Sequence, residues 1–213
     1  MLFRSDSQQV AEIAALFAVA DSNGEGGIVI FTDSNFEVAL AKSDSMAQII
    51  EQCAGCTLHS IEDVSLADTA TEMPARITQL HSEYGDNWNY SLGINDLYFD
   101  FGGPSIEIAF GGADKPKSLS AGDGSISAYG RIRTADGQVG TVPEPLKLHG
   151  WQMIDELNRA FADEDWSGYV TPVHLVVPSN IRFDGGPENV YNPENGYQDA
   201  YKNIWAGNAV AQE

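Results

Sequence analysis

The stretch from Gly93 to Val142 constrains the fold most, because its apolar residues alternate with polar or small ones. The first two alternating runs place Leu97, Phe99, Phe101, Ile106, Ile108 and Phe110 at every second position. Alternation with a period of two is typical of strands that bury one face. The Gly-Gly-Pro at 102–104 and the Asp-Gly at 136–137 would supply the turns. The sequence therefore predicts an α+β fold with an antiparallel β-meander at about residues 93–142, covered by amphipathic helices.

Elsewhere the hydrophobic periodicity predicts helices at about 6–20, 44–53, 72–84 and 149–163. Short apolar runs predict strands at 28–32, 36–41, 57–66 and 169–177, and residues 111–124 read as a long loop. From residue 178 the chain becomes polar. We therefore expect a single α+β domain at 1–178, followed by a polar C-terminal arm at 179–213.

The arm contains Tyr197, Tyr201 and Trp205, which fall one helical turn apart. This spacing predicts a short helix with an aromatic face. Such a face can dock on its own domain or on a neighbouring subunit, since Tyr and Trp are favoured anchors at interfaces. Lys115 and Lys117 lie in the 111–124 loop, which is a second candidate for contacts with a partner.

The chain is strongly acidic: 31 Asp and Glu against 11 Lys and Arg give a net charge of −20. Such a surface repels phosphate groups, which argues against direct binding of nucleic acid or of anionic membranes. No apolar run reaches the length of a membrane-spanning helix. The apolar stretch at 13–20 ends like a signal-peptide cleavage site, but Asp6 and Glu12 argue against that interpretation. We expect a cytoplasmic or virion protein that is not secreted through a cleaved signal peptide.

Two loops resemble the calcium loop of EF-hand proteins, which spaces oxygen ligands around a glycine. The candidate ligands are Asp21, Asn23 and Glu25 in the first loop, and Asp163, Asp165 and Ser167 in the second. Both loops lack the glutamate that an EF-hand needs at position twelve, and both lead into predicted strands. Ordinary turn chemistry explains the same residues. Calcium is thus the weaker interpretation of these loops, and no other cofactor is indicated.

Cys53 and Cys56 form a C-x-x-C pair, with His59 three residues further on. The pair ends a predicted helix, whereas a redox-active pair sits at a helix N-terminus. A zinc site would need a fourth ligand, for which His81 is the nearby candidate. Small buried residues at a helix end are the favoured interpretation, with a metal site as the alternative.

The sequence contains no nucleophile elbow, no H-E-x-x-H and no phosphate-binding glycine loop. This favours a non-enzymatic protein. The leading hypothesis is a structural or assembly subunit, such as a component of a phage head or tail, that binds copies of itself or other subunits. Two alternatives stay open: an acidic inhibitor that mimics nucleic acid, and an enzyme or calcium-binding module.

Overall fold

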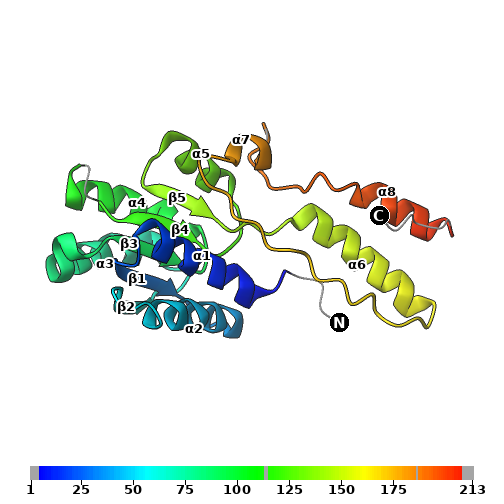
Figure 1. The fold of residues 1–213 in the computed structure, drawn as a ribbon, viewed down its shortest axis with the longest axis horizontal. Helices are drawn as coiled ribbons and strands as arrows, with labels where there is room; N and C mark the ends of the chain where they lie inside the picture. Colours follow the sequence, from blue (N-terminus) through cyan, green and yellow to red (C-terminus); the bar gives the residue numbers. More distant parts are fainter. Residues whose placement is uncertain (1–4, 113–114, 186, 208–213) are drawn as a thin grey trace.

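The structure is a computed structural model that describes residues 5–112, 115–185 and 187–207. Parts of the predicted 111–124 loop and of the predicted arm, namely 113–114, 186 and 208–213, lie outside the described residues. One five-stranded sheet forms the centre of the molecule, with strand order β2-β1-β3-β4-β5 (Figure 1). All neighbouring strands in it are parallel. The strands are β1 (Gly27–Thr32), β2 (Thr57–Asp63), β3 (Tyr90–Gly93), β4 (Lys117–Ser120) and β5 (Gln138–Thr141).

Helices cover both faces of the sheet. Helices α1 (Ser7–Asp21) and α2 (Glu37–Glu51) pack together on one face, against β1 to β4. On the other face lie α3 (Thr69–Tyr84), α4 (Leu97–Phe110) and α5 (Ile126–Thr134), with the short 3-10 helix η1 (Gly85–Asn87) after α3. Parallel neighbours need such crossover helices, and the right-handed crossover decides which face each helix takes.

The core lies between the sheet and these two helical layers. Every residue of β1 is buried, which suits a parallel strand that is covered on both faces. The ring of Phe31 on this strand stacks on Tyr98 of α4, with ring centroids 5.8 Å apart. The Tyr98 hydroxyl donates a hydrogen bond to the Val64 carbonyl after β2, so the buried ring leaves no polar atom without a partner.

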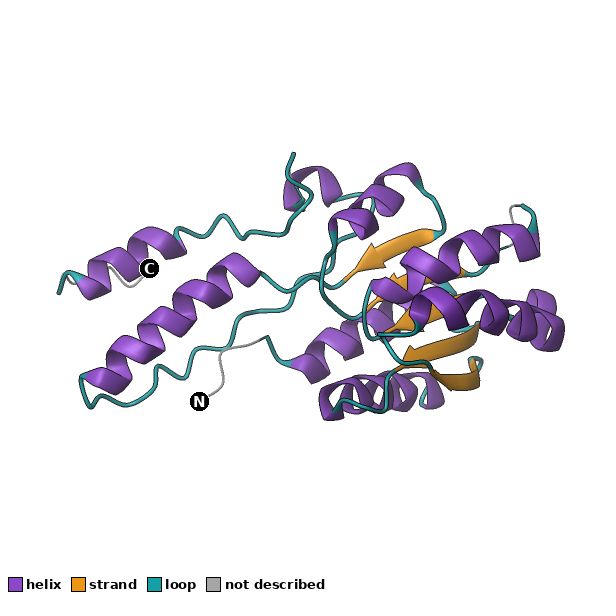
Figure 2. Cartoon of the chain, turned by 180° about the vertical axis from the view of Figure 1, so that it is seen from behind, coloured by secondary structure: helices purple, strands orange, loops and turns teal. Residues whose placement is uncertain are grey.

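The C-terminal part leaves this sheet. Helix α6 (Leu146–Phe161) projects away from the end of β5, and an extended segment returns beside it toward α7 (Ile181–Asp184) (Figures 1 and 2). Helix α8 (Tyr197–Trp205) then packs along α6. The predicted strand at 169–177 is wrong as a ladder strand: this segment makes only two isolated bridges, Thr171 to Ser5 and Val176 to Thr141.

The predicted antiparallel meander is wrong, because residues 93–142 alternate between helices and short parallel strands. Residues 97–110 form α4, whose buried side is Tyr98, Phe99, Gly102 and Ile106, a helical and not a strand spacing. At Gly102 the two helices approach closely, since an added Cβ would lie 2.8 Å from the terminal methyl group of Met73 on α3. Glycine and proline cost a helix interior about 1 and about 3 kcal/mol. Close packing of α4 on α3 outweighs that cost.

Other expectations are confirmed. Helices lie at the predicted positions 6–20, 72–84 and 149–163, and strands lie at 28–32 and within 57–66. The second helix begins at Glu37, earlier than expected, so the predicted strand at 36–41 is wrong. None of the described helices is long and apolar enough to cross a membrane.

Candidate functional site

The order of the strands singles out one edge of the sheet. Strands β1 and β3 are neighbours, but the chain leaves β1 toward β2 and leaves β3 toward β4, in the opposite direction. The loops that follow these two strands therefore diverge at the carboxyl ends of the strands. In open parallel sheets, ligands bind at this point, where the strand order reverses. The side chains in these loops are thus the first candidates for a binding site.

The loop after β1 is held by Asp33, which is fully buried. Its carboxylate accepts hydrogen bonds from the backbone N–H groups of Asn35 and Leu66, and from the Asn35 side chain at 2.8 Å. Burial alone would raise the pKa of Asp33, but these hydrogen bonds outweigh burial and place the pKa below its usual value. The loops after β1 and β2 are therefore tied together, and Asn35 and Phe36 are left exposed at the edge.

The loop after β4 is held by Asp96, at the end of β3. One of its oxygens accepts hydrogen bonds from the backbone N–H groups of Gly124 and Ser125, at 2.8 and 2.9 Å. The other accepts from the Ser120 hydroxyl and the Gln138 amide. Burial raises the pKa of Asp96, against the opposing effect of these donors. With four donors around it, this carboxylate is a structural anchor with no free capacity for a ligand.

Lys42 reaches the same edge from α2. Its side chain is 8% exposed, and its Nζ donates a hydrogen bond of 2.6 Å to the Ala121 carbonyl. The next residue, Gly122, has φ +114°, and an added Cβ there would lie 2.8 Å from Nζ. Glycine at 122 adopts this positive φ without strain and leaves room for the Lys42 ammonium beside the Ala121 carbonyl. Burial lowers the pKa of Lys42, while the charges of Glu144, Asp123 and Asp96 raise it.

Three further polar side chains lie in the loops at this edge. The Asn95 amide donates a hydrogen bond of 2.5 Å to the exposed carboxylate of Asp123. Glu144 follows β5 and is half-buried. The side chains that converge on the carboxyl edge are thus Lys42, Asn95, Asp123 and Glu144, from α2 and from the ends of three strands. We call this set the edge cluster.

The residues predicted as calcium ligands do not form such a convergence. Asp21 accepts hydrogen bonds from the Tyr90 hydroxyl at 2.6 Å and from the Lys117 ammonium at 2.5 Å. Asn23 and Glu25 are exposed at the opposite, amino edge of the sheet. Partial burial raises the pKa of Asp21, but Lys117 and Tyr90 outweigh it and lower the pKa. This carboxylate therefore serves an ion pair.

The second predicted loop lies at the far end of α6. Asp163 and Asp165 are exposed there, and the Ser167 hydroxyl donates to Glu156. Within the described part of the chain, no three His, Cys, Asp or Glu side chains are placed to share a metal ion. Calcium at either loop stays a prediction from the sequence.

The aromatic residues of α8 pack on α6 of the same chain. The Trp205 ring stacks on Trp151 at 5.3 Å, and Tyr201 and Tyr197 also contact that ring. The Trp205 indole N–H donates a hydrogen bond of 2.8 Å to Asp155. A shallow groove of about 480 Å³ beside this stack is lined by Leu146, Lys147, Gly150, Trp151, Ile154, Gln198 and Trp205. This groove is apolar, and none of the side chains of the edge cluster lines it.

The two lysines of the predicted 111–124 loop make internal ion pairs. Lys115 pairs with Glu107 at the end of α4, and Lys117, which begins β4, pairs with Asp21. The structure therefore places both side chains near the amino edge of the sheet, away from the edge cluster.

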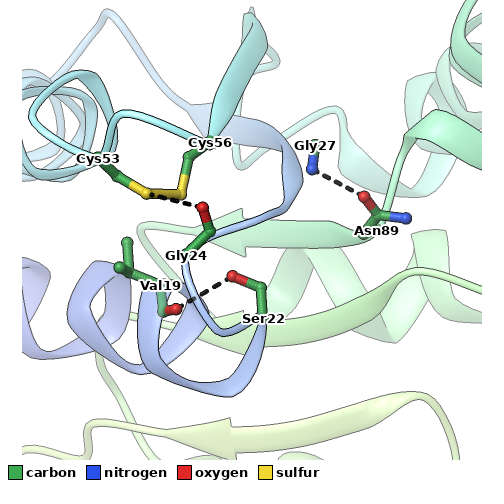
Figure 3. The surroundings of a disulfide bond; sticks show 7 residues. All are labelled: Val19, Ser22, Gly24, Gly27, Cys53, Cys56 and Asn89. Atoms are coloured by element: carbon green, nitrogen blue, oxygen red, sulfur yellow. Dashed lines mark hydrogen bonds between the residues drawn. A yellow bond between two sulfur atoms is a disulfide. The ribbon is translucent and has the colours of Figure 1, made fainter.

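Cys53 and Cys56 form a disulfide, which the sequence did not indicate (Figure 3). The bond links the end of α2 to the start of β2, and Cys53 Sγ lies 3.4 Å from the Gly24 carbonyl in the α1–β1 turn. His59 is engaged elsewhere: its ring contacts the Asn87 carbonyl at 2.9 Å and stacks on Tyr84. The zinc alternative is therefore wrong for this pair, and the cysteines join two elements at the amino edge.

No protein-family model and no curated protein matches this sequence. Solved structures do match. AraP, an arabinose-binding protein from Geobacillus stearothermophilus, has a TM-score of 0.72 and 12% identity, over 84% of this chain and 63% of its own. A Bacillus halodurans C-125 ABC transporter solute-binding protein with bound myo-inositol gives 0.74 and 20%, over 84% and 61%. The XylFII-LytSN complex gives 0.70 and 12%, over 83% and 61%.

The chain has the fold of these solute-binding proteins. It spans less than two thirds of their length. The expectation of a structural subunit of a viral particle is wrong, because the parallel sheet with helices on both faces is the architecture of these ligand-binding proteins. The alternative hypothesis of an acidic inhibitor that mimics nucleic acid is wrong for the same reason.

The sequence analysis missed the whole edge cluster. The signal that could have found it is local: Asn95-Asp96 and Gly122-Asp123 each follow a short run of small and apolar residues. Read as parallel strands, those runs would have placed both pairs at one edge of a sheet with this solute-binding-protein fold.

Proposed function

We propose that this chain binds a small polyhydroxylated solute, a sugar or a polyol, at the carboxyl edge of its sheet. The observation that carries the proposal is the edge cluster at the point where the strand order reverses. It brings an amide and an ammonium, both already hydrogen-bonded, together with two carboxylates that keep free acceptor capacity. Sugars present many hydroxyl groups, each a donor and an acceptor, and such mixed polar groups match them.

Two further observations support the proposal. The matched structures include an arabinose-binding protein and a protein with bound myo-inositol, both polyhydroxylated compounds. Phe36 lies exposed at the same edge, where an aromatic face can pack against the C–H groups of a sugar ring. Transport or sensing of such a solute is the biological role that we infer from these relatives.

Ligand binding can be tested by thermal unfolding and calorimetry with arabinose, glucose, galactose, myo-inositol and the amino sugars glucosamine and galactosamine. A ligand at 100 times its Kd stabilises the folded state by about 2.7 kcal/mol, which raises the Tm by several degrees. We expect Asp123→Asn to weaken binding by roughly 10-fold or more, because it removes a charged acceptor. Asp86→Asn, at the exposed amino edge, is the matched control. If no compound shifts the Tm at millimolar concentration, the proposed function is wrong.

A protein partner is a second proposal. One matched structure is named as a complex, XylFII-LytSN. The apolar residues Met153, Ile154 and Phe161 of α6 are exposed in this chain, which favours contact with another protein, either a copy of the chain or a different subunit. Light scattering on the full chain would show a defined mass above the monomer if copies associate.

A further inference from the structure

The charges of the edge cluster are not balanced. Lys42 is the one ammonium, and the carboxylates of Glu144, Asp123 and Asp96 act on it electrostatically. Arg131 of α5 pairs with Asp100 at 2.5 Å and is not a member of this cluster. The cluster therefore carries an excess of negative charge before any ligand enters.

The hydrogen bonds show which of these groups a ligand can use. Asp96 has its four donors, and Lys42 is buried with a bond to the Ala121 carbonyl. Asp123 is exposed and accepts one hydrogen bond, from Asn95. The Glu144 carboxylate has no hydrogen bond or ion pair with any of the residues that the structure describes. The groups with free capacity are thus Asp123 and Glu144, and both are acceptors.

His149 does not restore the balance. It lies five residues after Glu144, near the start of α6, and its Nε2 is 3.4 Å from the Ser5 hydroxyl. Burial lowers the pKa of His149, against the opposing charge of Glu144. The lowered pKa of His149 favours the uncharged imidazole, so this side chain does not supply a cation to Glu144.

We propose that the edge cluster selects a polyol that carries an ammonium group, over the uncharged sugar of the same shape and over its acidic derivative. This specificity rests on the proposed function. A ligand that covers Asp123 and Glu144 removes water from two carboxylates, which costs free energy unless donors replace that water. An ammonium supplies three donors and a positive charge, so the attraction between opposite charges adds to its hydrogen bonds with the carboxylates.

The two carboxylates also determine the relative affinities of the uncharged sugar and the sugar acid. An uncharged sugar offers hydroxyl donors to both carboxylates but leaves the excess charge in place, so it binds second. A sugar acid adds a carboxylate that Asp123 and Glu144 repel, and the buried Lys42 amine already has a partner. Its affinity is therefore the lowest of the three.

The test compares matched ligands on the full chain by calorimetry at about pH 6.5, where the amino sugar is charged and carboxylates are ionised. The series are glucose, glucosamine and glucuronate, and galactose, galactosamine and galacturonate. We expect the amino sugar of at least one series to bind about 10-fold more tightly than the uncharged sugar, and the acid about 10-fold more weakly. Raising the salt from about 0.01 M to about 0.1 M should shrink both ratios, since screening shortens from about 30 Å to about 10 Å.

Glu144→Gln keeps the shape of the side chain and removes its charge. We expect this variant to bind the amino sugar more weakly and to lose most of the preference for it over the uncharged sugar. Glu51→Gln, at the exposed far end of α2, should change neither ratio. If the uncharged sugar or the acid binds as tightly as the amine, the specificity is wrong and the proposed function stands. If no member of either series and no polyol binds, both are wrong.

Discussion

Asp33 and Asp96 show how a parallel sheet can carry a binding edge. Backbone N–H groups in the turns after parallel strands lack ladder partners, and a buried N–H without a partner is costly. Each of these carboxylates accepts two such N–H groups, from Asn35 and Leu66 for Asp33, and from Gly124 and Ser125 for Asp96. The loops at the carboxyl edge are therefore held in place by two carboxylates whose own hydrogen-bond partners are within the protein.

The hydrogen bonds of Asp33 should contribute to the free energy of unfolding. Asp33→Ala should destabilise the folded state by roughly 2–3 kcal/mol, because two buried N–H groups lose a charged acceptor. Asp33→Asn keeps one acceptor oxygen and should cost less. Thermal or urea unfolding at neutral pH measures both. A loss under about 0.5 kcal/mol for the alanine variant would show that water replaces the carboxylate without penalty.

The same residue predicts a pH dependence. The pKa of Asp33 is lower in the folded protein than its ordinary value of 3.8. Its stabilisation is therefore fully present above the unfolded pKa and is lost as the pH falls through the folded pKa. Between pH 5 and pH 3, Asp33→Asn should lose less stability than the unsubstituted protein. Asp44→Asn, which removes one exposed carboxylate on α2, is the matched control for the loss of a single charge.

At the scale of elements, α6 has an inverted pattern of burial. Three of the four residues that it buries are polar, namely Gln152, Asp155 and Glu156, and they bond to the extended segment and to α8. Most of its large apolar residues are exposed, and Phe161 is 85% exposed. The sequence shows the apolar spacing of this helix but not which side lies inside, because the returning segment supplies hydroxyl and carbonyl partners to the polar side.

This inversion can be tested by substitution. Replacing Ile154 and Phe161 together by serine should change the free energy of unfolding by less than about 1 kcal/mol, apart from a small loss of helix propensity. Solubility should rise, since an exposed apolar patch is removed. Gln152→Ala should cost about 1–3 kcal/mol, because the buried Thr171 hydroxyl loses its acceptor. If the serine pair costs more than Gln152→Ala, the apolar side of α6 is packed within the chain.

The elements also show where the sequence was informative. Long helices such as α3 bury one side against the core and expose the other, and their period survives in the sequence. Strands β3 and β4 are four residues long and largely buried, so they show no alternation. In α4, Leu97 and Phe101 happen to sit at even spacing around Phe99, and the glycines and proline suggested a turn. Contacts between α4 and α3, which no local pattern records, decided the outcome.

The edge cluster could not be found by the same means. Its members come from α2, β3, β4 and β5, and they meet only because the strand order brings three carboxyl ends together. Because the sequence predicted the wrong fold class, it could not predict this site either. For the two cysteines the sequence shows the close spacing. It does not show the disulfide, which forms because the turn between α2 and β2 brings the two side chains together.

At the scale of the whole molecule, the net charge of −20 is the dominant electrostatic feature. Salt bridges neutralise few of the carboxylates, and like charges on a compact chain repel each other more than in the expanded unfolded chain. Salt screens that repulsion. Raising NaCl from about 0.01 M to about 0.1 M should therefore raise the Tm at pH 7, by on the order of 3 °C for each kcal/mol gained.

A comparison of two pH values separates this effect from a general action of salt. Near the sequence pI of about 4.2, positive and negative charges balance and net repulsion is small. The same addition of NaCl should then leave the Tm nearly unchanged, or lower it slightly by weakening ion pairs such as Arg131 with Asp100. An equal rise at both pH values would contradict self-repulsion as the cause, because the excluded-salt effect on burial does not depend on net charge.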